Sequence, residues 1–427
     1  MSVTQRISVS EYQPIPVGAV LRNEIRVAMA DLGTRLSPRF PFVSDSSRGV
    51  SVGNLIGALR LPSGNILEII PKTRPGLDWS RAVVDLIEPT TRFEVSGSKF
   101  AAPTSSSNSL RDAVAFEYAH RLENAVGSEG PIQVLVRQQH SERRLSGRLD
   151  VSRWVRGYSL HPEIFPIHRD EFTTNNIFTR TLAYVSTLLG RSTPNVQLRD
   201  RLERLSARVL PGLPTPWDVD PTALHRDLPL QWARYSPAWD LAAALLKNQH
   251  LLSSGGRALG LEVAVEPWPL LETLLTRNLH DAAAKLNAVI GFHDFTVPVK
   301  SRYPLMRTDK LAMSNRTVQS VEPDGLLLRQ GVAFASFEAK YVRFRGKPER
   351  EHVFQAISTA AALGAPVAVL VYPEEFGIHR YVLPSLVSPS RIFAIGLDLF
   401  GYRPSDSQNG VGRQVLDQVL GSICLDT

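Results

Sequence analysis

The residues that could do chemistry are concentrated in one stretch near the C-terminal end, Glu322–Phe344 (EPDGLLLRQGVAFASFEAKYVRF). Asp324, Glu338 and Lys340 lie there within otherwise apolar, strand-like sequence. Long charged side chains are rarely buried without a partner. The three charges therefore either line a solvated face of a sheet or form a site that holds a charged ligand.

These residue types suit the hydrolysis of a phosphodiester bond. Residues two apart in a β-strand share a face, so Glu338 and Lys340 are expected to point the same way. Mg²⁺ binds through one or two carboxylates, water and substrate phosphate. The ion would polarise the phosphoryl group and activate a water molecule. Lys340 could orient that water or stabilise the developing negative charge.

Whether Asp324 can join Glu338 depends on the hairpin between the two strands. A two-residue loop at 330–331 would place Asp324 opposite Phe337, on the wrong face of the sheet. A three-residue loop at 330–332 would place it opposite Glu338. A working site therefore predicts a three-residue or bulged turn, or a bend that swings Asp324 inward.

The elements around this stretch alternate between helix and strand. Pro and Gly mark the ends of the expected helices, and short apolar runs mark the strands. The expected order is a helix over 267–287, two strands joined by a turn at 330–331, a helix over 348–364 and a buried strand over 366–373.

With 427 residues, the chain is too long for one typical core, and we predict a multidomain α+β protein. Residues 1–100 are predicted to form a β-rich N-terminal domain. Residues 101–255 are predicted to form a mixed, then mainly helical middle region. Residues 256–427 are predicted to form the C-terminal α/β domain. A Ser-rich stretch at 96–109 and a Gly-containing stretch at 253–260 indicate the two boundaries.

The formal net charge is +7, and arginine accounts for 40 of the 48 basic residues. Arginine suits bidentate contacts with phosphate, so a polyanion such as DNA is a reasonable partner. Seven arginines in the middle region form either a solvated strand face or a strip that binds phosphate or a partner: Arg137, Arg143, Arg144, Arg148, Arg153, Arg156 and Arg169.

Several classes of protein are disfavoured. Cys424 is the only cysteine, so neither an internal disulfide nor a cysteine-rich zinc site is expected. The sequence contains no phosphate-binding loop, no G-x-S-x-G elbow and no H-E-x-x-H motif. No secretory signal and no membrane-spanning run is recognised, so a cytoplasmic protein without membrane contact is predicted.

The segment PDGLLLRQGVAFASFEAKY resembles the PD-(D/E)xK nuclease motif, whose superfamily has a mixed sheet flanked by helices. Three further blocks resemble McrC proteins in the same order along the chain. They are GNILEIIPKT, LSGRLDVSRWV with IHRDEFTTNNIFTRTLAYV, and FQAISTAAALGAPVAVLVYPE. The central block departs from the family pattern, because Asn175 and Thr179 stand where the family has Asp and Asn.

This resemblance implies a function, partners and cofactors. McrC proteins are nuclease subunits of modification-dependent restriction systems, which act in antiviral defence. The chain would be a DNA endonuclease that uses Mg²⁺, or Mn²⁺ in its place. Its N-terminal domain would engage and stimulate an AAA+ GTPase of the McrB type. Double-strand cleavage would need two active sites, which dimerisation could supply; the sequence leaves the oligomeric state open.

The resemblance also assigns roles to residues. Asp324, Glu338 and Lys340 take the nuclease roles, with both carboxylates on the metal. Gln355 matches a helix glutamine near the metal site. Glu272 would add a metal-side carboxylate or else be a solvated helix residue. Lys72 and Arg74 either contact the partner or belong to an exposed turn.

Two other functions compete with this interpretation. The first is a non-catalytic adaptor that activates an AAA+ NTPase and uses the nuclease fold only as a scaffold. The second is a standalone DNA repair nuclease without a motor. An intact set of Asp324, Glu338 and Lys340 favours the enzyme over the adaptor.

Overall fold

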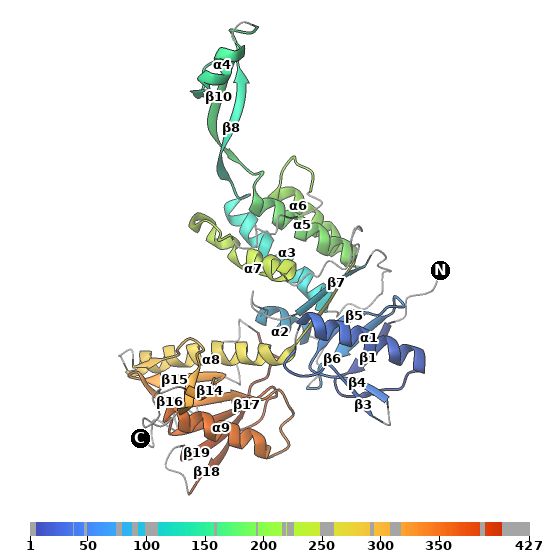
Figure 1. The fold of residues 1–427 in the computed structure, drawn as a ribbon, viewed down its shortest axis with the longest axis vertical. Helices are drawn as coiled ribbons and strands as arrows, with labels where there is room; N and C mark the ends of the chain where they lie inside the picture. Colours follow the sequence, from blue (N-terminus) through green and yellow to red (C-terminus); the bar gives the residue numbers. More distant parts are fainter. Residues whose placement is uncertain are drawn as a thin grey trace. The chain divides into compact units, whose positions relative to one another are not determined.

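A computed structural model of the chain describes residues 6–36, 38–46, 49–73, 79–87, 93–98, 110–157, 160–193, 195–215, 219, 226–247, 260–290, 294–307, 317–384 and 389–403. The chain forms two compact units (Figure 1). The first comprises 1–96, 108–113 and 262–427, and the second comprises 97–107 and 114–261. The N-terminal and C-terminal regions, predicted as separate domains, therefore belong to one unit, and the middle region is inserted between them.

The N-terminal region is built on two small sheets. The larger has the strand order β1-β6-β5-β11-β7, and the smaller has the order β2-β4-β3. Their bounds are β1 Arg6–Ser10, β2 Pro14–Ile15, β3 Val43–Ser46, β4 Gly49–Val52, β5 Ile56–Arg60, β6 Ile66–Ile70, β7 Phe93–Ser98 and β11 Gly260–Val265. Two helices accompany them, α1 Ala19–Leu36 and α2 Trp79–Leu86.

Helix α1 is an 18-residue element that the sequence analysis missed. It contributes a narrow buried stripe, with Ile25, Met29 and Leu32 packed into the N-terminal core. Val20 and Val27 are exposed on its other side. Apolar residues thus lie on both the buried and the exposed side of α1. They therefore hide the 3.6-residue repeat by which an amphipathic helix is recognised in a sequence. The prediction of a β-rich region is therefore incomplete, because α1 and α2 lie among its strands.

Strand β11 returns the chain to the N-terminal sheet after the middle region. Ala264 and Val265 pair with Gly57 and Ile56 of β5. The approach is close, because a Cβ on Gly57 would lie 2.2 Å from the Val263 carbonyl oxygen. Gly57 also has a φ of +116°, a conformation that favours glycine. The segment from 260 to 265 therefore belongs to the N-terminal sheet, whereas the predicted boundary at 256 assigned it to the C-terminal domain.

The second unit contains both strands and helices, and its later part is helical. Its elements are most of α3 Leu110–Glu129, then β8 Val134–Glu142, β9 Arg148–Leu149, α4 Val151–Gly157, β10 Phe165–Thr173, α5 Ile177–Ser192, α6 Val196–Val209, the 3₁₀ helix η2 Leu230–Tyr235 and α7 Ser236–Lys247. Asn176 caps α5 and forms a capping box with Thr179. The departure from the family pattern at Thr179 therefore keeps a well-defined helix start.

Strands β8 and β10 form a long antiparallel ribbon, paired from Val134↔Thr173 to Glu142↔Phe165. Figure 1 shows this ribbon extending away from the helices of its unit, with α4 at its far end. We call the described residues 134–157 and 160–173, which include β8, α4 and β10, the arm. Large apolar side chains are exposed along it, among them Leu135, Val151, Val155, Leu160 and Phe172.

The C-terminal region is a mixed six-stranded sheet with the order β12-β15-β16-β17-β19-β18. Its strands are β12 Phe295–Thr296, β15 Gly325–Arg329, β16 Val332–Ala339, β17 Val367–Tyr372, β18 His379–Val382 and β19 Arg391–Gly396. Strands β13 Tyr303–Arg307 and β14 Thr317–Val321 form a separate pair. The helices are α8 Pro267–Ile290 and α9 Arg350–Leu363, so the predicted order of elements is present.

Helices α8 and α9 cover opposite faces of the sheet. A Cβ on Gly325 would lie 2.6 Å from Leu279 of α8 and 3.3 Å from Phe337, which places Phe337 on the α8 face. Glu338, the next residue, accepts hydrogen bonds from Gln355 and Thr359 of α9. Neighbouring residues of a strand point to opposite faces, so the charged residues of β16 lie under α9.

The hairpin between β15 and β16 has the register that the site requires. Its turn is two residues long, Gln330 and Gly331, both with positive φ, as in a type I′ turn. The ladder then shifts by one residue between Leu328 and Leu327 and ends at Gly325↔Phe337. This shift is a β-bulge, and it brings Asp324 level with Glu338. The prediction of a bulged connection is confirmed, although the bulge lies in the ladder beyond the turn.

Candidate active site

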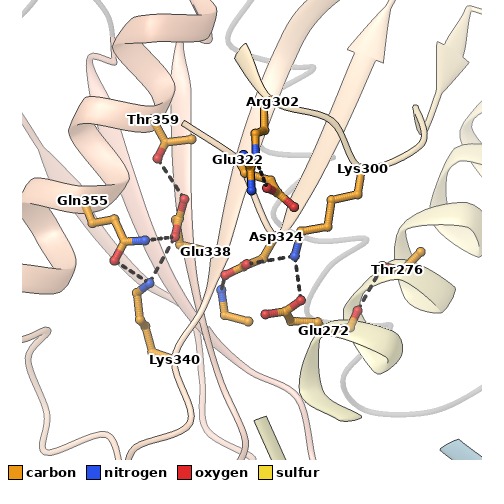
Figure 2. A network of polar contacts seen from close by, with 11 residues as sticks. Glu272, Thr276, Lys300, Arg302, Glu322, Asp324, Glu338, Lys340, Gln355 and Thr359 are labelled. Atoms are coloured by element: carbon orange, nitrogen blue, oxygen red, sulfur yellow. Dashed lines mark hydrogen bonds and ion pairs between the residues drawn. The ribbon is translucent and has the colours of Figure 1, made fainter. Parts of the chain in front are cut away.

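Asp324, Glu338, Lys340 and Gln355 are brought together at one end of the C-terminal sheet (Figure 2). Asp324 immediately precedes β15, and its Oδ2 accepts a hydrogen bond of 2.8 Å from the Ala339 amide. Lys340 immediately follows β16. Its ammonium donates to Glu338 Oε2 at 3.0 Å and to Gln355 Oε1 at 2.9 Å. Two strands and one helix therefore hold the four side chains.

Glu338 is a buried carboxylate, with only 1% of its surface exposed. Its Oε2 also accepts a hydrogen bond of 2.7 Å from the Gln355 amide, and its Oε1 accepts one of 2.8 Å from the Thr359 hydroxyl. Burial raises the pKa of Glu338; the Lys340 charge opposes this rise and Asp324 adds to it. A solvated sheet face, the alternative considered for these charges, does not describe this residue.

Thr359 should stabilise the fold through its bond to Glu338. Replacing Thr359 by valine keeps the shape of the side chain but leaves Glu338 Oε1 without that donor. Loss of a hydrogen bond to a buried charge should lower the free energy of unfolding by about 1–3 kcal/mol, measured by urea denaturation. Thr276→Val is the matched control, because the exposed Thr276 hydroxyl bonds only its own helix backbone. Equal effects of the two substitutions would contradict the assignment.

Glu272 of α8 lies on the other side of Asp324, next to a residue that the sequence analysis missed. The Lys300 ammonium donates to Glu272 Oε2 at 2.7 Å and lies 3.5 Å from Asp324 Oδ1. Burial, followed by the Asp324 charge, raises the pKa of Glu272 to about 7, and Lys300 opposes the rise. The Glu272 side chain is only 18% exposed, so the solvated alternative does not describe it.

Lys300 belongs to no motif, and the only sequence signal that could have found it is the scarcity of lysine in this chain. It lies between β12 and β13. Burial lowers the pKa of its ammonium, but the hydrogen bond to Glu272 and the charges of Glu272, Asp324 and Glu322 outweigh that effect and raise it.

A cleft of about 370 Å³ opens beside these residues. The C-terminal region contributes Glu272, Asp324, Lys340 and Gln355 to its lining. The N-terminal region, part of the same compact unit, contributes Tyr12, Arg39, Phe40 and Asn54. The guanidinium of Arg39 lies 5.5 Å from the Phe40 ring centre and 6.0 Å from that of Trp268. The cleft thus combines carboxylates, cations and aromatic rings.

Lys72 joins the N-terminal region to the strand end that carries Lys340. Its ammonium donates to the Tyr341 carbonyl oxygen at 2.7 Å and lies over the rings of Tyr12 and Tyr341. Glu11 Oε2 accepts from the Tyr341 hydroxyl at 2.6 Å and from the Lys72 amide at 3.1 Å. We call Glu11, Lys72 and Tyr341 the junction. Burial lowers the pKa of Lys72 to about 8, an effect that the Glu11 charge opposes.

Lys72 is therefore neither part of an exposed turn nor free to contact a partner with its ammonium. Arg74, the other residue considered for that contact, lies outside the described residues.

The donor set suits a hard divalent cation. Among the described residues, no group of three or more His, Cys, Asp or Glu side chains is arranged to hold a metal. Mg²⁺ needs fewer protein ligands, because it keeps several waters and binds through one or two carboxylates and substrate phosphate. Asp324 lies level with Glu338 at the end of the β15–β16 ladder, so these two carboxylates fit such an ion. Among the helices that the structure describes, none has the length and apolar character of a membrane span.

Comparison with known proteins places the chain in a family. Residues 50–373 match the family model described as McrBC 5-methylcytosine restriction system component. This match spans well over half of the sequence, so the chain belongs to that family. The comparison with curated proteins gave no match.

One solved assembly contains a chain of similar fold. The chain is similar to one in the refined half-complex from the tetradecameric assembly of Thermococcus gammatolerans McrB AAA+ hexamers with bound McrC. The TM-score is 0.63 at 16% identity, covering 97% of this chain and 100% of that one. A chain of the cryo-EM structure of the Thermococcus gammatolerans McrBC complex gives a TM-score of 0.44 at 17% identity, covering 64% and 88%. The McrC-like character predicted from the sequence is confirmed by the family match and the fold.

Proposed function

We propose that this chain is the Mg²⁺-dependent DNA endonuclease subunit of a McrBC-type restriction system. The observation that carries the proposal is the β-bulge in the β15–β16 hairpin. It brings Asp324 level with Glu338, and Lys340 is bonded to Glu338. A six-stranded mixed sheet with a helix on each face supports a PD-(D/E)xK domain in the C-terminal region.

The roles of the residues follow from their contacts. When bound, Mg²⁺ would polarise the phosphoryl group of the substrate and activate a water molecule. Asp324 and Glu338 would hold the ion, and Mn²⁺ would bind in the same way. The Ala339 amide orients Asp324. Lys340 presents an ammonium that stabilises negative charge on the phosphate, and Gln355 holds both Lys340 and Glu338 in place.

DNA is the polyanion that we propose for the cleft. The net charge of +7 favours its approach. Arg39 lines the cleft together with the carboxylates, and its guanidinium lies near the rings of Phe40 and Trp268. A guanidinium so placed suits a phosphate of the DNA backbone. Cleavage of both strands would require two such sites, supplied by two copies of the chain.

An AAA+ GTPase is the second partner that we propose. The related solved assembly contains McrB AAA+ hexamers with bound McrC. The N-terminal region was expected to make this contact. The arm is a further candidate, because exposed apolar residues such as Val155 and Leu160 mark surfaces that bind other proteins. Its arginines would then belong to a partner-binding strip, one of the alternatives considered above.

The test combines cleavage and GTPase assays on the purified chain. Methylated and unmethylated plasmids are incubated with Mg²⁺, the AAA+ partner and GTP or ATP, with the wild-type chain or Asp324→Ala. We expect cleavage of methylated plasmid that needs the metal, the partner and Asp324. Stimulated hydrolysis of GTP without cleavage would show that the chain is a non-catalytic adaptor. Cleavage that does not require the partner would show that it is a standalone nuclease.

A further inference from the structure

The Lys300 ammonium lies between two carboxylates of the candidate site. Its ammonium contacts Glu272 Oε2 at 2.7 Å and lies 3.5 Å from Asp324 Oδ1 (Figure 2). Lys340 occupies the corresponding position on the other side, in contact with Glu338 Oε2 at 3.0 Å. The three carboxylates are thus flanked by two ammonium groups, each contributed by a different segment of the chain.

The formal charges favour one divalent ion over two. Three carboxylates and two ammonium groups leave one net negative charge. One divalent ion turns this into one positive charge, which is equal and opposite to that of a phosphodiester. Two divalent ions would leave three positive charges in a partly buried site, where like charges repel strongly.

We propose that Lys300 is a positioning residue that takes the place of a second metal ion, so that the nuclease site binds one divalent cation, between Asp324 and Glu338. This inference rests on the proposed function. It also refines the role predicted for Glu272. In the wild-type chain Glu272 binds the Lys300 ammonium, and it becomes a metal ligand only when that ammonium is removed.

Competition for the same oxygens is the physical basis of the proposal. A Mg²⁺ ion needs oxygen ligands at about 2.1 Å and gives up its water reluctantly. An ammonium already in contact with Glu272 Oε2 and close to Asp324 Oδ1 would have to leave first. The Lys300 side chain is 41% exposed, so it can move. We expect the ammonium to stay in place, because its charge completes the balance of the site.

Metal stoichiometry tests this without any cleavage assay. Mn²⁺ binding to the full chain is measured by isothermal titration calorimetry and by electron paramagnetic resonance at pH 8, without DNA. We expect one ion per chain for the wild type and for Lys300→Arg, and two for Lys300→Met. Adding Glu272→Gln to Lys300→Met should return the count to one. Arg302→Met is the matched control, because Arg302 pairs with Glu322 and should leave the count at one.

The other outcomes distinguish the role of Lys300 from the proposed function. Two ions in the wild-type chain, or one ion in a folded Lys300→Met chain, would overturn the role of Lys300 and leave the proposed function standing. No Mn²⁺ binding to the wild type would overturn the proposed metal-dependent function and this inference with it. Asp324→Asn combined with Glu338→Gln should abolish the binding. Ions that persist in this double variant would lie elsewhere and would count against both.

Discussion

Lys340→Met is expected to lower the rate of DNA cleavage by about 10²–10⁴-fold, the range typical of a single group that acts on the proton or charge of the reaction. Methionine keeps the length and volume of the side chain but removes the ammonium that faces Glu338 and Gln355. The rate is measured as single-turnover cleavage of supercoiled plasmid in the presence of the AAA+ partner. Cleavage at the wild-type rate would remove Lys340 from the mechanism.

This variant also separates catalysis from partner activation. Stimulation of GTP hydrolysis by the partner should persist, because the Lys340 ammonium lies in the cleft and bonds Glu338 and Gln355. Lys347→Met is the matched control, since Lys347 is an exposed lysine of the segment between β16 and α9 and should leave both activities unchanged. If Lys340→Met loses GTPase stimulation and Lys347→Met keeps it, Lys340 serves both DNA cleavage and partner stimulation.

Glu11→Ala is expected to have the largest effect on stability. Glu11 is 2% exposed, and its carboxylate accepts from the Tyr341 hydroxyl and the Lys72 amide. Its removal leaves the half-buried Lys72 ammonium without the nearby negative charge. Breaking such a buried arrangement by removing one partner typically costs about 3–5 kcal/mol. The measurement is the free energy of unfolding from denaturant titration.

The comparison with an exposed ion pair makes this prediction specific. Asp45→Ala removes a pair with Arg26 in which both side chains are about half exposed, so it should cost at most about 1 kcal/mol. Glu11→Gln should fall between the two, because an amide oxygen can still accept from Tyr341. A similar small loss for Glu11→Ala and Asp45→Ala would show that the junction contributes little to stability.

The amino-acid sequence by itself determined which residues form the core of the candidate site. Strand residues alternate between faces, so Glu338 and Lys340 had to share one. The same period left only two registers for Asp324, and only the bulged register brings it to Glu338. The structure contains that bulge. Gln355 followed from its place in a block that resembles McrC proteins, and it contacts both Glu338 and Lys340.

Only the tertiary structure decided which distant segments meet. Lys300 reaches Glu272 across 28 residues, and Lys72 reaches Tyr341 across 269. Strand β11, predicted as part of the C-terminal domain, pairs with β5 of the N-terminal region. Local spacing carries no information about such contacts, because they depend on how separate elements pack. α1 was missed for a related reason, since only packing showed which of its apolar residues form the buried stripe. The sequence thus identified the carboxylates and Lys340, and the packing brought Lys300 to Glu272 and Asp324.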